Sequence, residues 1–314
     1  MEERSHKLID NDAGKDELAS LRLAAELAGL KVDEFVLPGD HHVVLRGMRF
    51  HYLDWGRKGP PILFLHGRGL TAHTYDLVCL ALRHDCQCIS LDQRGHGDTE
   101  WSPVLDYGRE SEAEDVAALV EHLGWSRFVL VGMSMGGLNS IVYAGRHSDT
   151  LAGLVIVDVG PEVRTFGSAR IRQFLSEPDG LDSIDDYVAR AVEFNPLRHP
   201  SLLRRSLLHS LRRRPDGKWT WKMDRRLWEQ NANPASDPDR SHLLWADVER
   251  IYCPTLVLRG EKSEVFRDED ADKLARAFPK GSWARILGAG HTIQGDNPAA
   301  MVDEMRDFLI TIGY

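Results

Sequence analysis

The chain has 314 residues, of which 42% are hydrophobic and 28% charged, so it can bury a substantial core as a globular protein. Its formal net charge of −9 argues against nucleic acid or an anionic membrane as the main partner. The sequence contains no apolar run of about 18 residues, the length that a bilayer-spanning helix needs, and residues 1–15 do not look like a secretory signal. We therefore expect a cytoplasmic protein with no nucleic-acid or membrane partner.

Two local features of the composition have plain structural interpretations. Residues 197–226 hold ten Lys or Arg against two Asp, which we interpret as a solvated helical face rather than a polyanion site. The four cysteines lack the paired spacing of a zinc site, so we expect free thiols in the core. They are Cys79, Cys86, Cys88 and Cys253.

Residues 1–32 are predicted to be an N-terminal extension with one helix. Within 16–30, apolar residues recur at helical spacing; they are Leu18, Leu21, Leu23, Ala24 and Leu27. This helix could pack on the body, contact a second subunit or stay mobile, and the sequence leaves these alternatives open.

From residue 36 onward, short apolar runs alternate with helical patterns. This rhythm predicts an α/β fold with a mostly parallel central sheet covered by helices on both faces. The predicted strands are 42–45, 49–53, 61–65, 86–91, 128–131, 151–157, 255–258 and 283–287. The predicted helices are 71–82, 111–123, 134–147, 268–278 and 298–312.

A long interruption separates the strand at 151–157 from the next strand at 255–258. A crossover between parallel strands needs only a dozen residues or slightly more, so most of this stretch must be an insertion. Its apolar pattern predicts short helices at 168–176, 184–194, 201–213 and 225–230. We expect the core to comprise residues 33–160 and 240–314, and the insertion residues 161–239.

The most informative motif follows the strand at 128–131. Residues 132–136 read Gly-Met-Ser-Met-Gly and run directly into a predicted helix. A strand that ends in G-x-S-x-G places its serine on a sharp turn, where the flanking glycines avoid collisions with neighbouring backbone. The turn would expose the Ser134 hydroxyl above the sheet and place the Met135 N–H at a helix start, where anions are stabilised.

With this motif in place, the chain resembles the α/β-hydrolase superfamily over residues 36–314. The resemblance rests on five motifs in register: residues 65–69 (LHGRG), 92–97 (DQRGHG), 132–137 (GMSMGG), 254–260 (PTLVLRG) and 288–291 (GAGH). It implies a nucleophile, an acid and a histidine in that chain order, with a helical cap inserted after the sixth core strand, where the interruption falls.

Ser134, at the centre of the G-x-S-x-G motif, is the expected nucleophile. A serine hydroxyl becomes reactive only beside a base that takes its proton. His291, in the glycine-rich turn at 288–290, is the expected base. The resemblance gives His66 a role in shaping a loop. It also implies an oxyanion hole formed by the backbone N–H groups of Met135 and Arg68.

The acid that orients the histidine is harder to place. Many members of the superfamily carry it three residues after the glycine that ends the strand at 254–260, but this chain has Ser263 there. The next residue, Glu264, is the first choice because some members carry Ser-Asp at this pair. Asp158, at the end of the sixth strand, is the alternative, and Glu261 ranks behind both.

The nature of the nucleophile narrows the chemistry. Haloalkane dehalogenases and epoxide hydrolases use aspartate at this position, so Ser134 favours acyl transfer. We expect a serine esterase for small, fairly apolar esters or lactones that needs neither metal nor cofactor. The alternatives are a C–C bond hydrolase, an amidase, a perhydrolase or acyltransferase with the same triad, and a ligand receptor. Four aromatic residues of the insertion, which pack cap helices more often than they touch substrate, are candidate pocket walls: Phe174, Phe194, Trp219 and Trp221.

Overall fold

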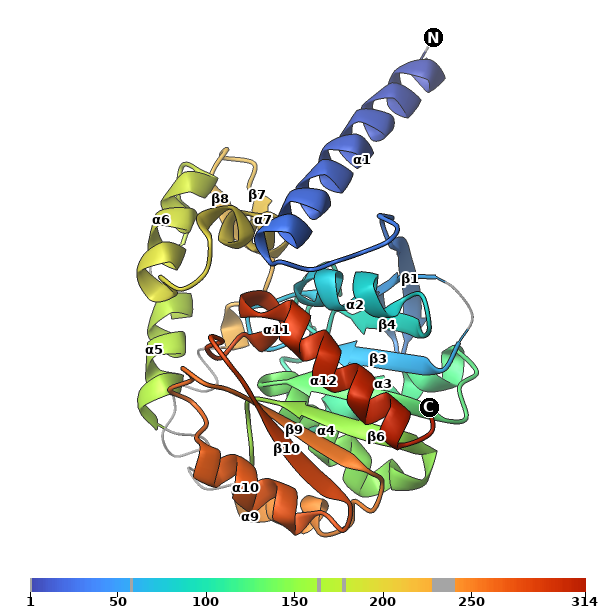
Figure 1. The fold of residues 1–314 in the computed structure, drawn as a ribbon. Coiled ribbons are helices and arrows are strands. Elements are labelled where there is room, and N and C mark those ends of the chain that lie inside the picture. Colours follow the sequence, from blue (N-terminus) through green and yellow to red (C-terminus); the bar gives the residue numbers. More distant parts are fainter. Residues whose placement is uncertain (1, 57–58, 163–164, 177–178, 228–240) are drawn as a thin grey trace.

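A computed structural model describes residues 2–56, 59–162, 165–176, 179–227 and 241–314 (Figure 1). Its centre is an eight-stranded sheet in the order β1-β2-β4-β3-β5-β6-β9-β10. The strands are β1 (Gly39–Leu45), β2 (Met48–Asp54), β3 (Pro61–Leu65), β4 (Gln87–Leu91), β5 (Phe128–Met133), β6 (Leu151–Val157), β9 (Thr255–Gly260) and β10 (Gly281–Ile286). Only the β1–β2 and β2–β4 pairs of this sheet are antiparallel, which confirms the predicted, mostly parallel α/β architecture.

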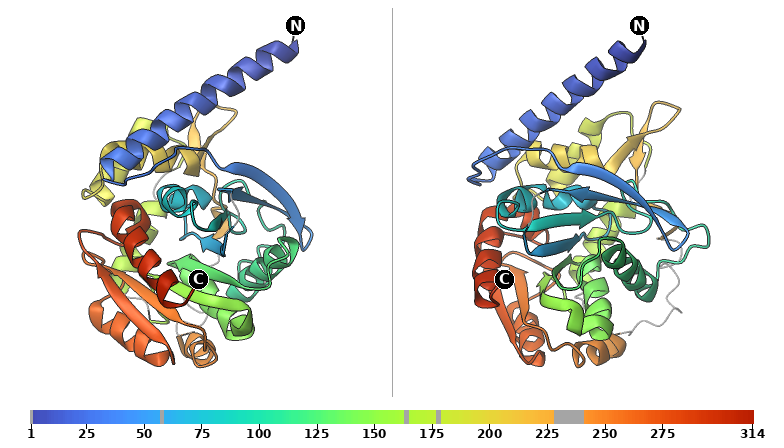
Figure 2. Two further views of the ribbon diagram at one scale, coloured as in Figure 1. Left: turned by 45° about the vertical axis from the view of Figure 1, so that its right-hand side comes forward. Right: turned by 90° about the vertical axis from the view of Figure 1, so that its right-hand side faces the viewer.

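Helices cover both faces of this sheet (Figures 1 and 2). One face packs against α3 (Arg109–His122), α4 (Met135–His147), α9 (Ser241–Val248) and α10 (Asp268–Ala277). The other packs against α2 (Asp76–Leu82), α11 (Ile293–Asp296) and α12 (Pro298–Thr311). The short 3-10 helices η1 (Ala72–Tyr75) and η2 (Ser148–Thr150) precede α2 and β6.

The central strand β5 explains why the predicted strands are apolar along their whole length. Phe128 and Leu130 belong to the core on the α3–α4 side, whereas Val129 and Val131 belong to the core on the α2–α12 side. All four are fully buried. A strand with helices on both faces has no solvent side, so its side chains need not alternate between apolar and polar.

The insertion between β6 and β9 forms a cap with its own small core. It contains α5 (Thr165–Ser176), α6 (Ile184–Phe194), α7 (Pro200–Ser210) and a hairpin of β7 (Leu211–Arg213) and β8 (Trp219–Trp221). The helix predicted at 201–213 is therefore wrong in its last three residues, which pair as β7 with β8. The predicted helix at 225–230 and the predicted cap boundary at 239–240 lie partly or wholly outside the described residues.

The N-terminal helix α1 (Glu2–Leu27) is longer than predicted and projects from the body at its start (Figure 2). Its last turns are docked, since Leu21, Ala24 and Ala25 are buried against the α2–α12 side of the core. Glu17 forms an ion pair with Arg205 of the cap helix α7. Packing on the body is thus the arrangement that this helix adopts.

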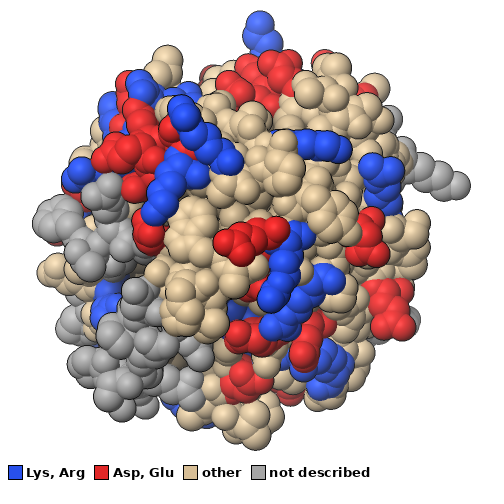
Figure 3. All heavy atoms as spheres, turned by 90° about the horizontal axis from the view of Figure 1, so that it is seen from below, with Lys and Arg blue, Asp and Glu red and all other residues tan. Residues whose placement is uncertain are grey.

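The described surface carries both signs of charge. On the face shown in Figure 3, basic and acidic side chains are interspersed over most of the coloured surface. Among the described helices, none combines the length and apolarity needed to cross a membrane. All four cysteines are free and buried, as expected for core residues.

Candidate active site

Ser134 lies on a strained turn between β5 and α4. Its backbone has φ 52° and ψ −115°, a region that residues with a side chain rarely adopt. The flanking glycines are required by close backbone approaches: a Cβ on Gly132 would collide with the Gly136 carbonyl, and one on Gly136 would collide with the Leu65 carbonyl. The sharp turn predicted from the G-x-S-x-G motif is therefore present.

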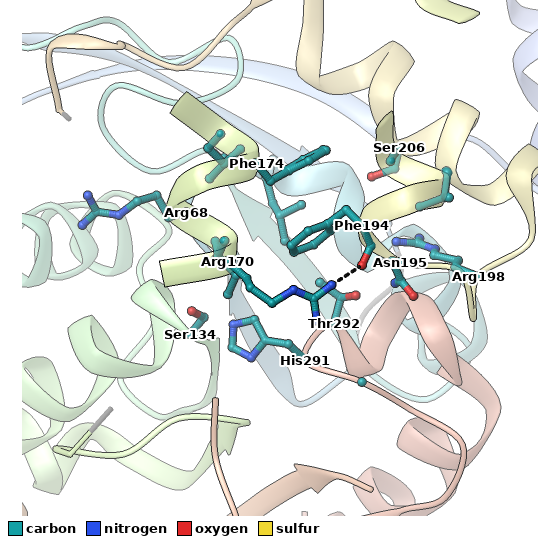
Figure 4. A pocket seen from close by; sticks show the side chains of 18 of the residues that line it. Arg68, Ser134, Arg170, Phe174, Phe194, Asn195, Arg198, Ser206, His291 and Thr292 are labelled. Carbon is teal, nitrogen blue, oxygen red and sulfur yellow. Dashed lines mark hydrogen bonds between the residues drawn. The ribbon is translucent and has the colours of Figure 1, made fainter. Parts of the chain in front are cut away.

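Ser134 and His291 both line a cavity of about 380 Å³ between the core and the cap. They lie next to each other in Figure 4, with Ser134 at the end of β5 and His291 in the loop that precedes α11. The structure thus brings together the two residues that were predicted to be nucleophile and base, although they are far apart in the sequence.

The ring of His291 is oriented by Asp158. Nδ1 of His291 lies 2.7 Å from Oδ2 of Asp158, which is fully buried at the end of β6. The same carboxylate accepts hydrogen bonds from the Gly260 N–H, at 2.8 Å, and from the Ser263 hydroxyl. Asp158 itself adopts φ 53°, so the chain turns sharply to present the carboxylate. An acceptor at Nδ1 leaves Nε2 of the neutral ring able to accept a proton.

Glu264 does not fill the position for which it was predicted. Its carboxylate forms an exposed ion pair with Arg170 of α5, and the acceptor for His291 is Asp158, the alternative acid. The reason lies in the sheet, because β6 and β9 are neighbours and their carboxyl ends meet at the same edge. An acid at the end of either strand can therefore reach the same histidine. Ser263, which replaces the usual carboxylate, supports Asp158 instead.

The loop after β3 is held by His66, in agreement with its predicted shaping role. This fully buried ring hydrogen-bonds the Gly67 carbonyl through Nδ1 at 2.8 Å and accepts from the Gln93 N–H at Nε2 at 3.0 Å. Burial lowers the pKa of His66, which keeps the ring neutral. The His66 carbonyl accepts from the Gly136 N–H, at 3.1 Å, so the loop is fastened to the first turn of α4.

The two predicted oxyanion donors belong to these two segments, Arg68 to the loop and Met135 to the start of α4. Met135 is the first residue of α4, where its N–H has no carbonyl one turn earlier in the helix. Arg68 follows Gly67, at which a Cβ would come within 2.5 Å of the Met133 sulfur. In Figure 4 the Arg68 side chain points away from Ser134.

The cap supplies much of the cavity wall. Of the four aromatic residues predicted as candidate walls, Phe174, Phe194 and Trp221 line the cavity, whereas Trp219 does not. The rings of Phe174 and Phe194 stack with centroids 4.6 Å apart. No local sequence motif marks the polar residues of the wall, so they are not predictable from the sequence; they include Arg170, Asn195, Arg198, Ser206 and Thr292.

Two clusters of potential metal ligands occur among the described residues, and both lie outside this cavity. One consists of His73, Asp76 and His209, and the other of His51, Asp92 and Asp98. Their carboxylates already have partners in the chain: Asp76 pairs with Arg205, Asp92 with His51 and Asp98 with Lys222. We therefore interpret both clusters as ion-pair networks.

Comparison with known proteins agrees with the fold described above. Residues 60–298 match the model of the alpha/beta hydrolase fold family. The chain is 30% identical to Esterase Rv0045c of Mycobacterium tuberculosis, covering 96% of this chain and 98% of that protein. A crystal structure of that esterase superimposes with a TM-score of 0.75. N-formylmaleamate deformylase of Pseudomonas putida is 36% identical, with 88% of this chain and 97% of that protein covered. The chain belongs to the α/β-hydrolase family and is a hydrolase of that fold.

Proposed function

We propose that this hydrolase is a serine esterase that cleaves small, fairly apolar carboxylic esters. The observation that carries the proposal is that Ser134 and His291 lie next to each other at the cavity wall, while the buried Asp158 is hydrogen-bonded to His291. This arrangement supports a serine nucleophile that is activated through a histidine and an acid. The similarity to the mycobacterial esterase supports the same activity.

In the proposed mechanism the Ser134 hydroxyl attacks the ester carbonyl while His291 takes its proton. The negative charge that develops on the carbonyl oxygen would be stabilised by the N–H groups of Met135 and Arg68, each worth about 3–4 kcal/mol in the transition state. Collapse of this intermediate breaks the bond to the alcohol, which leaves with the proton from His291. Water, deprotonated by the same histidine, then attacks the acyl-enzyme, and the carboxylic acid and free serine are released.

The size and lining of the cavity support the proposed substrate class. Its volume of about 380 Å³ is near the lower end of the range for small-molecule sites, about 300–1,000 Å³. Apolar side chains from the cap form much of its wall, and these include Ile171, Phe174, Leu203 and Leu207. A short acyl chain would bury its methylenes there and gain about 0.8 kcal/mol for each.

Hydrolysis of a small amide is a second candidate. The observation in its favour is the 36% identity to a protein named N-formylmaleamate deformylase. The same three residues would serve, with protonation of the leaving nitrogen by His291 as the more demanding step. Parallel assays with an ester and the amide of the same acid would rank the two activities.

A fluorophosphonate probe tests the serine mechanism directly. We expect one adduct per chain, located at Ser134 by mass spectrometry and abolished in Ser134→Ala and His291→Ala. Ser206→Ala is the matched control, because this hydroxyl lines the same cavity without a histidine partner in the described structure. Labelling at another residue, or no labelling together with no turnover of p-nitrophenyl acetate, would contradict the proposal. The second result would favour a ligand receptor.

A further inference from the structure

One positively charged group in the cavity has no hydrogen-bonding partner among the described residues. Arg198 lies between α6 and α7 in the cap and lines the cavity. Its Nε is completely buried and has no acceptor, and neither Nη atom makes a hydrogen bond or ion pair with a described residue. A buried donor without an acceptor costs about 1–3 kcal/mol, and more when it is charged. An acceptor supplied by a ligand would recover this energy.

The second arginine that faces the cavity is different. Arg170 forms an ion pair with Glu264 and donates to the Phe194 carbonyl at 3.2 Å. Its charge is therefore already balanced within the chain. Arg198 has the carboxylate of Asp296 nearby, but its hydrogen-bond donors have no acceptor among the described residues.

The Arg198 side chain is held by its packing against the core helix α11. Its guanidinium group lies against α11 at Gly295, where an added Cβ would be 2.5 Å from Cζ. Burial lowers the pKa of Arg198, and the charge of the neighbouring Asp296 only partly opposes this. The oxygens of Asp296 accept from the Gly290 N–H, at 3.0 Å, and from Nδ2 of Asn195, at 3.1 Å. Asp296 thus holds the loop beside His291 and makes no hydrogen bond to the arginine.

Arg198 is separated from the proposed catalytic residues across the cavity. In Figure 4, Ser134 and His291 lie on one side of the view and Arg198 lies with Asn195 on the other. The Arg170 guanidinium group and Thr292 lie between these two sides in the view, and the rings of Phe174 and Phe194 lie above them. A ligand that reached both ends would need a reactive carbonyl, a short apolar spacer and an anionic end.

We propose that Arg198 binds a carboxylate at the remote end of the substrate, so that the natural substrate is an ester bearing one free carboxylate on a short chain. The inference rests on the proposed function and specifies its substrate class. A planar guanidinium matches a carboxylate with two parallel hydrogen bonds, which gives both energy and orientation. A single guanidinium also balances a single negative charge.

Matched pairs of substrates test this proposal. Mono-p-nitrophenyl esters of dicarboxylic acids from succinate to suberate would be compared with p-nitrophenyl esters of the neutral acids of equal chain length. Acetyl esters of ω-hydroxy acids and of the corresponding alcohols, followed by pH-stat, place the carboxylate on the alcohol side. We expect a higher kcat/KM for the anionic member in at least one pair. Arg198→Gln should lower that value roughly 10- to 100-fold, mainly through KM, and leave the neutral member within about 3-fold.

Two further variants separate recognition from a general effect of charge or structure. Arg198→Lys keeps the charge but loses the planar fork, so it should recover only part of the preference. Arg204→Gln removes the same charge from an exposed position on the adjacent helix α7, where Arg204 pairs with Asp185, and should change neither substrate. If Arg198→Gln slowed neutral and anionic esters equally, Arg198 would be a positioning residue for the loop with Asp296, and the proposal would be overturned.

The design also separates failure of this proposal from failure of the proposed function. Equal hydrolysis of both members of every pair would refute carboxylate recognition and leave the esterase intact. A binding measurement does not depend on turnover: Ser134→Ala should bind monoethyl glutarate more tightly than ethyl pentanoate in calorimetry, and the added Arg198→Gln change should remove the difference. Equal binding of the two esters would overturn the proposal even if no ester were hydrolysed.

Discussion

The Asp158→Asn substitution should remove most of the proposed esterase activity through the protonation of His291. Oδ1 of Asp158 accepts from the Gly260 N–H, whereas Oδ2 faces both the Ser263 hydroxyl and Nδ1 of His291. If the asparagine oxygen keeps the bond to Gly260, its NH₂ group points at Nδ1. The ring then has to carry its proton on Nε2, which faces the nucleophile and can no longer accept a proton.

The size of this effect follows from the loss of the correct tautomer. Comparable changes in serine hydrolases lower kcat by about 10⁴, and at about 1.36 kcal/mol for each factor of ten this is about 5 kcal/mol of lost transition-state stabilisation. We expect kcat for p-nitrophenyl acetate to fall about 10³- to 10⁴-fold at neutral pH. Stopped-flow or steady-state assays would be combined with thermal unfolding to show that the variant is folded.

Glu264→Gln is the matched control, because it makes the same carboxylate-to-amide change in the acid first predicted from the sequence. The ion pair of Glu264 with Arg170 is exposed, and such pairs contribute about 0–1 kcal/mol. We expect kcat to change by less than about 5-fold. A loss in Glu264→Gln as large as that in Asp158→Asn, with both proteins folded, would refute the assignment of Asp158.

Three further substitutions test the buried polar groups. Ser263→Ala removes the hydroxyl that donates to the proposed triad acid and should lower kcat by up to about tenfold in the same assay, with KM unchanged. Burial raises the pKa of Glu112 from 4.5 to about 7, so the stability that this group contributes is lost as pH rises through that range. Glu112→Gln should therefore stabilise the protein by up to about 3 kcal/mol more at pH 8 than at pH 5. Equal differences in unfolding free energy at the two pH values would contradict this. For Asp76, burial acts to raise the pKa, but His73 and Arg205 lower it to about 2; its stabilising effect is present above the usual carboxyl pKa and is lost as pH falls toward 2. Asp76→Asn leaves the buried Arg205 without this partner and should cost about 3–5 kcal/mol in urea unfolding at neutral pH, whereas a change below about 1 kcal/mol would count against the network.

The parts of the fold that depend on local patterns could be predicted from the sequence. The predicted strand at 128–131 and the turn around Ser134 follow from neighbouring residues, since an apolar run and two glycines define them. The acid that pairs with His291 could not be predicted in this way, because its identity depends on which strands are adjacent in the sheet. The pairing of β6 with β9 brings Asp158 and Ser263 together, and no sequence spacing records that adjacency.

In the cap, too, only the elements with a local sequence pattern could be predicted. Its helices at 168–176 and 184–194 have apolar periodicity and agree with α5 and α6. The hairpin of β7 and β8 has only three residues in each strand, too few for an alternating pattern, so the sequence predicts residues 211–213 as the end of a helix. Arg198 lies in a connection between helices, where only the folded chain shows that a guanidinium faces the cavity.

Two of the ion pairs between the cap and the core differ in their exposure to solvent. The ion pair of Arg205 of α7 with Asp76 is buried, whereas the ion pair of Arg170 of α5 with Glu264 is exposed. Dissolved salt weakens an exposed pair far more than a buried one. Raising the ionic strength should therefore loosen the contact of α5 with the core before that of α7.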